Sequence, residues 1–282
     1  MSDGVDMIKI ISILVLSISL TSCALFSKDP TESRQSDIYY AQGTKNLVDQ
    51  KYSEALKNLL KANELKSNDT DILNNLAMAY YFKKKPKTAL KYLKRALEID
   101  SKNSDARNNL ATILMQQGKL NIAKKQYEII LNDLVYKKNF RVYYNLALIY
   151  LKQGNTIKAK ELLVESVGHR EDYCAAHYQL ASIYEKEASY ANAKKHYDRA
   201  SRGSCKTESL PLYRLALLYL KMGKELMAKE YLLKIKKEFP DEKIAKSATK
   251  LLRSLKKKDE YRANNFKLKN KKNNINYDSG NF

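Results

Sequence analysis

The sequence predicts an all-α protein in which six helix pairs follow one another and a further helix closes the row. One observation is a pattern of large and small apolar residues that recurs about every 34 residues between residues 36 and 240. The other is composition. Apolar residues make up 44% of the chain, glycine and proline are scarce, and no stretch alternates in the manner of a half-buried strand.

The N-terminal segment has the features of an export signal. Lys9 precedes an apolar run at residues 10–20, which is too short to cross a bilayer but suits the core of a signal peptide. Asp3 and Asp6 fit the start of such a signal poorly, so Met1 and Met7 both stay open as the first residue. The other interpretation of the apolar run is a buried hydrophobic helix.

The apolar run ends in Leu20-Thr21-Ser22-Cys23, which resembles a lipobox, the site where a cysteine receives a diacylglyceryl group. We therefore expect residues 1–22 to be a lipoprotein signal peptide and Cys23 to carry lipid, including palmitate, with residues 23–35 as a lipidated tether. Two or more acyl chains anchor a protein stably. In a Gram-negative cell, Ala24 after the cysteine implies the periplasmic face of the outer membrane.

The repeats are defined by matching positions in each helix pair. The first helix places a large, a small and a third apolar residue on one stripe. The second helix carries a small residue, then a bulky one four positions later, then another small or apolar one. The first-helix sets are Leu76-Ala77-Tyr80, Leu110-Ala111-Leu114, Leu146-Ala147-Tyr150, Leu180-Ala181-Tyr184 and Leu215-Ala216-Tyr219. The second-helix sets are Ala89-Leu93-Ala96, Ala123-Tyr127-Ile130, Ala159-Leu163-Ser166, Ala193-Tyr197-Ala200 and Ala228-Leu232-Ile235.

A degenerate first copy carries Gly43, Ala55, Leu59 and Ala62. Small residues let the two helices of a pair approach closely, and the large residues fill the space against the neighbouring repeat. Gly118, Gly154 and Gly223 stand where a helix end takes a left-handed residue.

The connections and the C-terminal segment complete the organisation. Two extra residues fall within 131–139, which indicates a small bulge between the third and fourth repeats. After residue 240, apolar residues recur at helical spacing, so residues 241–258 are expected to form a capping helix over the last repeat. Residues 259–282 are rich in lysine and asparagine and are expected to be a disordered basic tail.

Export makes the two remaining cysteines informative. Cys174 begins the first helix of the fifth repeat, and Cys205 follows its second helix, so a hairpin brings both to one end. A disulfide between them is one interpretation, and two partly buried free thiols are the other. A metal site made of Cys174, His177 and His169 is disfavoured, because no second ligand pair matches the first.

Catalysis has no support in the sequence. Neither a glycine-rich phosphate loop, a nucleophile elbow nor a paired metal-ligand motif occurs, so we expect no enzyme, cofactor, metal or small-molecule substrate. The formal net charge is +21, which in the cytoplasm would suggest nucleic acid as a partner. An exported lipoprotein does not meet a genome, so we expect no nucleic acid. Anionic lipids, cell-wall polymers, acidic proteins and simple solvation by lysine stay open.

The repeated residues resemble the tetratricopeptide repeat, and the resemblance covers residues 36–240. It implies a right-handed superhelical solenoid whose concave groove is lined by the first helices and binds a protein segment. The fifth position of each first helix would point into the groove, although some of these tyrosines could pack between helices instead. The fifth positions are Tyr40, Asn74, Asn108, Tyr144, Tyr178 and Tyr213. Neighbouring lining positions are Met78, Tyr81, Met115, Leu148, Leu151, Leu217 and Leu220.

A lipobox, six such repeats and a capping helix together resemble the pilotins of type IV pili, the PilF/PilW/Tgl-type lipoproteins. By this resemblance the partner is a secretin subunit, which the protein helps to localise and assemble at the outer membrane. A periplasmic adaptor that recruits cell-wall enzymes and a component of outer-membrane barrel assembly stay open as alternatives. Glu238-Phe239-Pro240 followed by helical sequence suggests the last of these.

Overall fold

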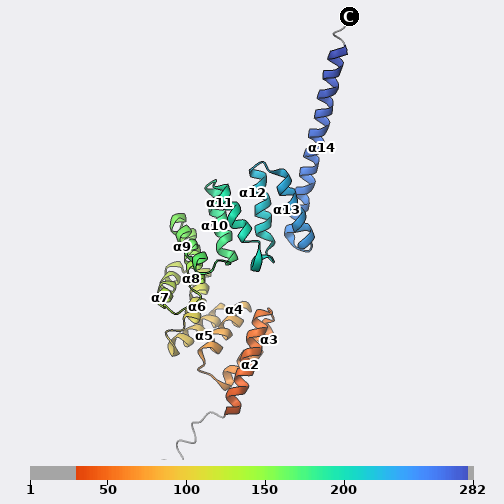
Figure 1. Ribbon diagram of the computed structural model, residues 1–282. Coiled ribbons are helices and arrows are strands. Elements are labelled where there is room, and N and C mark those ends of the chain that lie inside the picture. The colour runs from red at the N-terminus through yellow and green to blue at the C-terminus, as the bar shows by residue number, and fades with distance from the viewer. Residues whose placement is uncertain (1–29, 279–282) are drawn as a thin grey trace, which may run out of the picture. The chain divides into compact units, whose positions relative to one another are not determined.

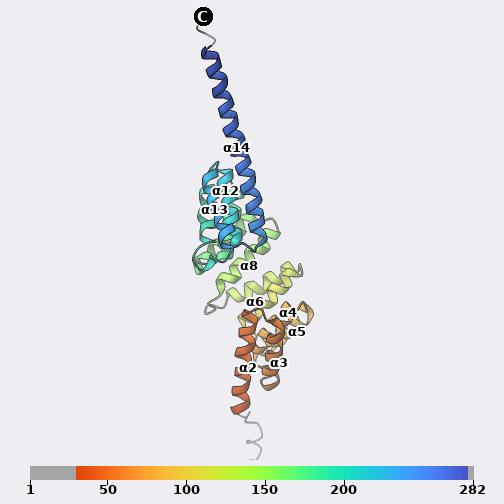
Figure 2. The same cartoon turned by 90° about the vertical axis from the view of Figure 1, so that its right-hand side faces the viewer.

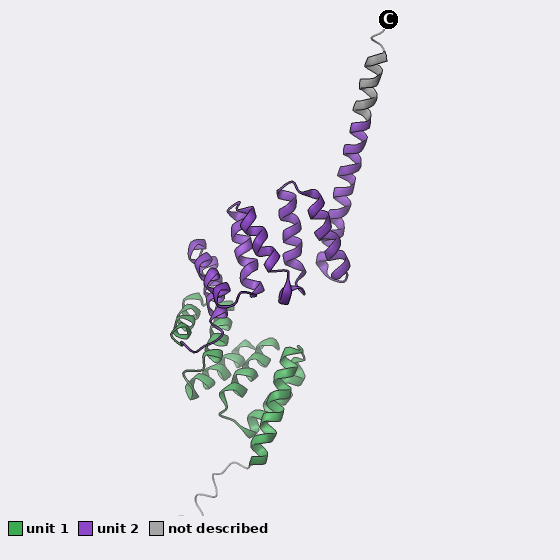
Figure 3. Cartoon of the chain, viewed as in Figure 1, with its two compact units in different colours: residues 1–133 green, residues 134–282 purple. Residues whose placement is uncertain are grey.

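The computed structural model describes residues 30–278, which form two compact units divided between Asp133 and Leu134 (Figure 3). All regular structure in this described part is helical. The division falls within the lengthened connection at 131–139. The expected signal peptide, Cys23 and the first part of the tether lie outside the described residues.

The first unit contains three helix pairs (Figure 1). The pairs are α2 (Pro30–Val48) with α3 (Tyr52–Leu65), α4 (Thr70–Phe82) with α5 (Pro86–Ile99), and α6 (Ser104–Gln116) with α7 (Leu120–Leu131). Local sequence explains several helix starts. The Asp69 carboxylate accepts from the backbone N–H groups of the first turn of α4, Asn103 does the same for α6, and Pro86 occupies the start of α5.

The second unit contains three further pairs and the long helix α14. The pairs are α8 (Asn139–Lys152) with α9 (Thr156–His169), α10 (Cys174–Lys186) with α11 (Tyr190–Arg199), and α12 (Ser209–Lys221) with α13 (Glu225–Glu238). A short 3-10 helix, η2 (Gly203–Cys205), lies between α11 and α12, and α14 (Lys243–Asp278) follows α13. Two perpendicular views show α14 running along the last pair and continuing beyond it (Figure 2).

Packing within each unit follows the repeat pattern. The small first-helix and second-helix residues from Ala77 and Ala89 through to Ala216 and Ala228 are fully buried. The bulky residues four positions after the second small residue, from Leu59 to Leu232, are also fully buried. In the first pair a β-carbon on Gly43 would lie 2.6 Å from Leu59 Cγ, so only glycine permits this approach. The predicted roles of these residues are confirmed.

A left-handed residue ends the first helix of each of the six described pairs. Gly118, Gly154 and Gly223 have φ of 77°, 80° and 71°, as the sequence predicts. The matching residues in the other three pairs are not glycine: they are Gln50, Lys84 and Ala188, with φ of 59°, 61° and 56°. The left-handed turn is therefore a property of the repeat itself. In three copies the residue at this position has a β-carbon, so its backbone is strained.

Two predicted boundaries are wrong. The tether does not extend to residue 35, because α2 begins at Pro30. Proline is favoured in a first helical turn, and Ser36 Oγ donates to Ala62 O (2.9 Å), which fixes α2 to α3.

The capping helix does not end at residue 258, because α14 continues to Asp278 through most of the expected disordered tail. Residues 241–279 contain neither proline nor glycine, and lysine tolerates helices well. Ion pairs also hold α14 to α13: Lys258 and Arg262 bind Glu225, and Lys229 binds Asp259.

The described helices include none that is both long and apolar enough to span a membrane.

Candidate partner-binding surface

Fifth-position residues of the first helices share one structural arrangement within each unit. For four of the six, which are Tyr40, Asn74, Tyr144 and Tyr178, the side chain at the sixth position of the next repeat forms a hydrogen bond with the fifth-position residue. In the first unit, Asn75 bonds Tyr40, and Asn109 Nδ2 donates to Asn74 Oδ1 (2.8 Å). Asn75 Nδ2 also donates to Thr44 Oγ1 (2.9 Å). These bonds fix the orientation of the side chains before any partner binds.

The second unit repeats this arrangement with other residue types. Gln179 hydrogen-bonds Tyr144, and the Arg214 guanidinium donates to Tyr178. Burial raises the pKa of the Tyr144 hydroxyl above its ordinary value, so this tyrosine stays neutral. Sequence reasoning missed the sixth position, although its amide and guanidinium groups at 75, 109, 145, 179 and 214 were visible as a periodic signal.

A pocket of about 300 Å³ opens beside Tyr144 and Tyr178. It is lined by Tyr144, Tyr173, Cys174, Ala175, Tyr178, Ala200, Glu208, Leu210 and Pro211. Tyr173 lies edge-on to Tyr144, with ring centroids 5.3 Å apart, and burial raises its pKa to about 12. The volume is at the small end for ligand pockets, which suits one large side chain of a bound segment.

Glu208 is the single carboxylate among these lining residues, and it is exposed. Leu210 and Pro211 at the start of α12 also line the pocket, and Leu210 is 42% exposed. An apolar side chain with a neighbouring cation would therefore match both the pocket walls and its charge.

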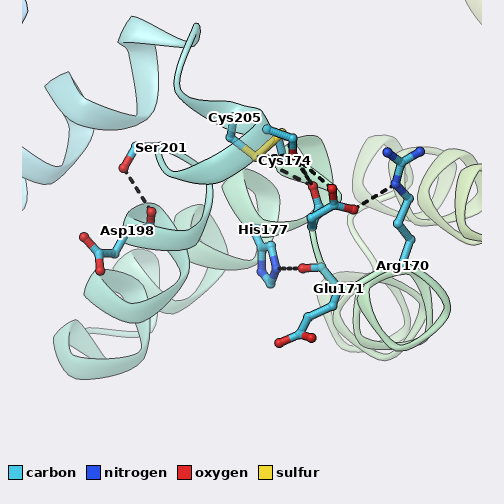
Figure 4. Close-up of a disulfide and its surroundings, with 9 residues drawn as sticks. Arg170, Glu171, Cys174, His177, Asp198, Ser201 and Cys205 are labelled. Carbon is cyan, nitrogen blue, oxygen red and sulfur yellow. Dashed lines mark hydrogen bonds and ion pairs between the residues drawn. A yellow bond between two sulfur atoms is a disulfide. The ribbon is translucent and has the colours of Figure 1, made fainter.

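Cys174, which lines this pocket, forms a disulfide with Cys205. Figure 4 shows the bond and the residues around it. The disulfide joins the start of α10 to η2, with Cα atoms 5.6 Å apart, and Cys205 is buried. Ser204 Oγ adds a bond to the Asp172 carboxylate (3.0 Å), and this carboxylate also pairs with Arg170 (2.9 Å). The segment between α11 and α12 is thereby fixed against the first helix of the fifth repeat.

Two histidines of the fifth repeat, His177 and His196, have a structural role. His177 Nε2 donates to Glu171 O (2.7 Å), since a carbonyl oxygen can only accept. His177 Nδ1 then accepts from His196 Nδ1 (2.9 Å). Burial, with His177 nearby, lowers the pKa of His196 to about 4, and burial also lowers the pKa of His177. Both rings are therefore neutral near pH 7.

The disfavoured metal site has no geometric basis in the structure. Cys174 is in the disulfide, and the His169 ring stacks on Tyr143 with centroids 5.1 Å apart. Across the described residues, no group of three or more His, Cys, Asp or Glu side chains is placed to hold a metal ion.

Some of the remaining predicted groove residues are partly exposed, and others are buried. Met78, Tyr81, Leu148, Leu151, Leu217 and Leu220 are partly exposed, and Tyr81 hydrogen-bonds Gln116 on α6. Asn74, Asn108 and Met115 are at most 9% exposed, so the structure contradicts their role as open contact residues. Tyr213 lies outside the pocket, because it packs against the apolar cluster beneath α14. The position within the repeat alone does not reveal this burial or this packing.

Helix pairs with buried small residues, a left-handed turn in each pair and pre-oriented groups on the first helices define a helical-repeat solenoid. Models of the tetratricopeptide repeat match residues 70–103, 92–125, 140–171, 175–202 and 212–242, just over half of the chain. The chain belongs to the tetratricopeptide repeat family. Such repeats are typically protein-interaction modules without catalytic activity.

Comparison with individual proteins gives a more specific similarity. The type IV pilus assembly protein PilF of Pseudomonas aeruginosa is 24% identical over 197 residues, which is 68% of this chain and 78% of PilF. A solved PilF structure covers 75% of this chain and 95% of its own, with a TM-score of 0.64. A crystal structure of PilW, described as a widely conserved type IV pilus biogenesis factor, is also similar. The match covers 76% of this chain and 98% of PilW, with 18% identity and a TM-score of 0.64.

Proposed function

We propose that this protein is an outer-membrane lipoprotein of type IV pilus biogenesis that holds a segment of a secretin subunit. The similarity to PilF along most of both chains is the observation that carries the proposal. The lipobox at Cys23 supports a lipid anchor on the periplasmic face of the outer membrane.

The mechanism is capture without chemistry. The pocket beside Tyr144 and Tyr178 receives a large apolar side chain of the partner, and the hydrogen bonds from Gln179 and Arg214 keep its walls in place. A membrane anchor would then keep the bound subunit at high local concentration where a ring assembles.

Replacing Tyr144 and Tyr178 by alanine tests the site. Truncating a central aromatic contact costs about 2 kcal/mol or more, which is roughly a thirtyfold loss of affinity. We expect the variant to stay helical and at the membrane while secretin multimers in unboiled membrane extracts and surface pili decline. Tyr143→Ala is the matched control, because Tyr143 directly precedes Tyr144 in α8 but stacks on His169 outside the pocket.

Normal secretin multimers in a folded, correctly localised Tyr144→Ala/Tyr178→Ala variant would reject the proposed site or the pilotin role. Co-purification of cell-wall hydrolases or of barrel-assembly proteins would then identify which alternative applies.

The anchor is tested separately by mass spectrometry of the native protein. We expect the mature chain to begin at an acylated Cys23. An intact segment 1–22, or an unmodified Cys23, would reject the anchor but would leave the pocket assignment standing.

A further inference from the structure

The start of α14 is strongly basic. Residues 243–258 include seven lysines or arginines and no acidic residue. Four of them, Lys246, Lys250, Arg253 and Lys257, follow one another at steps of four, three and four and so lie on one side of the helix. All four are exposed. We call these four residues the cationic face.

No described carboxylate neutralises the charges of the cationic face. None of its four side chains forms an ion pair with a described carboxylate, whereas Lys258 and Arg262, on another side of α14, both bind Glu225. Like charges at this spacing repel one another in the free protein. An external polyanion would relieve that repulsion.

A hollow of about 500 Å³ lies between the end of α13 and the cationic face. Its lining residues are Lys236, Pro240, Ala245, Lys246, Thr249, Lys250 and Arg253. Four of the seven are cations, and no carboxylate is among them. The hollow therefore has ample room for a phosphate group and carries the positive charge that attracts one.

An aromatic ring continues the same side of the helix. Tyr261 follows Lys257 by four residues and is 68% exposed. The ring is therefore open to solvent, although Lys258 and Arg262 on another side of the helix contact Glu225 of α13. Exposed tyrosine beside lysine and arginine is typical of segments that lie at the headgroup level of a membrane.

We propose that the cationic face docks on an anionic phospholipid surface, with a headgroup phosphate in the hollow at Lys246, Lys250 and Arg253. The row spans about 16 Å along the helix, so a flat charged surface can contact all four cations at once. An acidic protein partner fits less well, because Ser247, Thr249 and Ser254 between the cations give it no apolar core to bury. This inference is independent of lipid attachment at Cys23.

The test measures binding to vesicles of pure phosphatidylcholine and of phosphatidylcholine mixed with phosphatidylglycerol. The full chain carries Cys23→Ser in every sample, so acylation plays no part, and neutral vesicles report any background from the apolar run at 10–20. The variant is Lys246→Glu/Lys250→Glu/Arg253→Glu. The control is Lys87→Glu/Lys91→Glu/Lys94→Glu, which makes the same charge change at the same spacing on the exposed side of α5.

Each basic residue at an anionic surface contributes about fivefold in affinity, so the variant should bind mixed vesicles at least about 100-fold more weakly. The control should stay within about threefold of the parent chain, and added salt should weaken parent binding. If the glutamate variant does not fold, the glutamine triple variant at the same positions replaces it.

Equal losses in the variant and the control would overturn the proposal, because net charge alone would then explain binding. Unchanged binding by the variant would also overturn it. Binding to soluble polyglutamate without binding to mixed vesicles would assign the face to an acidic protein instead.

Discussion

Replacing Cys174 and Cys205 together by alanine is expected to destabilise the second unit substantially. The two cysteines are 31 positions apart, so their bond closes a loop of about 32 residues in the unfolded chain. The chain-entropy relation for a loop of that length gives about 3.7 kcal/mol at 25 °C. This is a large part of the stability of an ordinary domain.

Urea denaturation followed by circular dichroism measures the effect. With a typical urea dependence of about 1–3 kcal/mol per molar, the unfolding midpoint of this unit should fall by more than about 1 M. The affinity of the pocket for its partner should fall as well, because Cys174 lines the pocket and Cys205 holds the segment that leads to Leu210.

Reductant supplies the internal control for this experiment. Reduced wild-type protein should unfold at the midpoint of the double variant, and the variant itself should not respond to reductant. A wild-type midpoint that is the same with and without reductant would refute the reasoning. Quantitative labelling of either cysteine in the native exported protein would show that the bond is absent there.

Two further predictions concern the same unit. Ala188→Gly should stabilise it by about 0.5–1 kcal/mol, because Ala188 has φ of 56°, whereas Gly154→Ala, at φ of 80°, should destabilise it in the same urea assay. Because folding lowers the pKa of both buried histidines from about 6.5, their contribution to stability is complete above pH 6.5 and is lost as the pH falls toward 4. His196→Asn keeps an N–H donor toward His177 and should flatten that pH dependence; an unchanged slope would contradict this assignment.

Residues that pack helices against helices were predictable from the sequence. Ala77, Ala89 and Leu93 recur at fixed spacing because every repeat must fill the same space with the same sizes of side chain. The left-handed residues at Gln50, Lys84 and Ala188 were missed, since only glycine signals this conformation in a sequence.

The binding surface was predicted less completely for physical reasons. Tyr144 and Tyr178 were found because they hold a repeated helical position. Tyr173, Leu210 and Pro211 belong to the segments that precede α10 and α12, where no helical period indicates direction. Asn108 was assigned to the groove by position, although neighbouring side chains leave it only 6% exposed.

Photo-crosslinking in living cells tests most directly whether the pocket holds a secretin segment. A photoreactive phenylalanine would replace Leu210, which lines the pocket and is 42% exposed, and Tyr143 would be replaced in the control. If the pocket holds a secretin segment, position 210, and not 143, will crosslink to one segment of a secretin subunit identified by mass spectrometry. A crosslink from 210 to cell-wall hydrolases alone, or equal secretin crosslinking from both positions, would contradict that prediction.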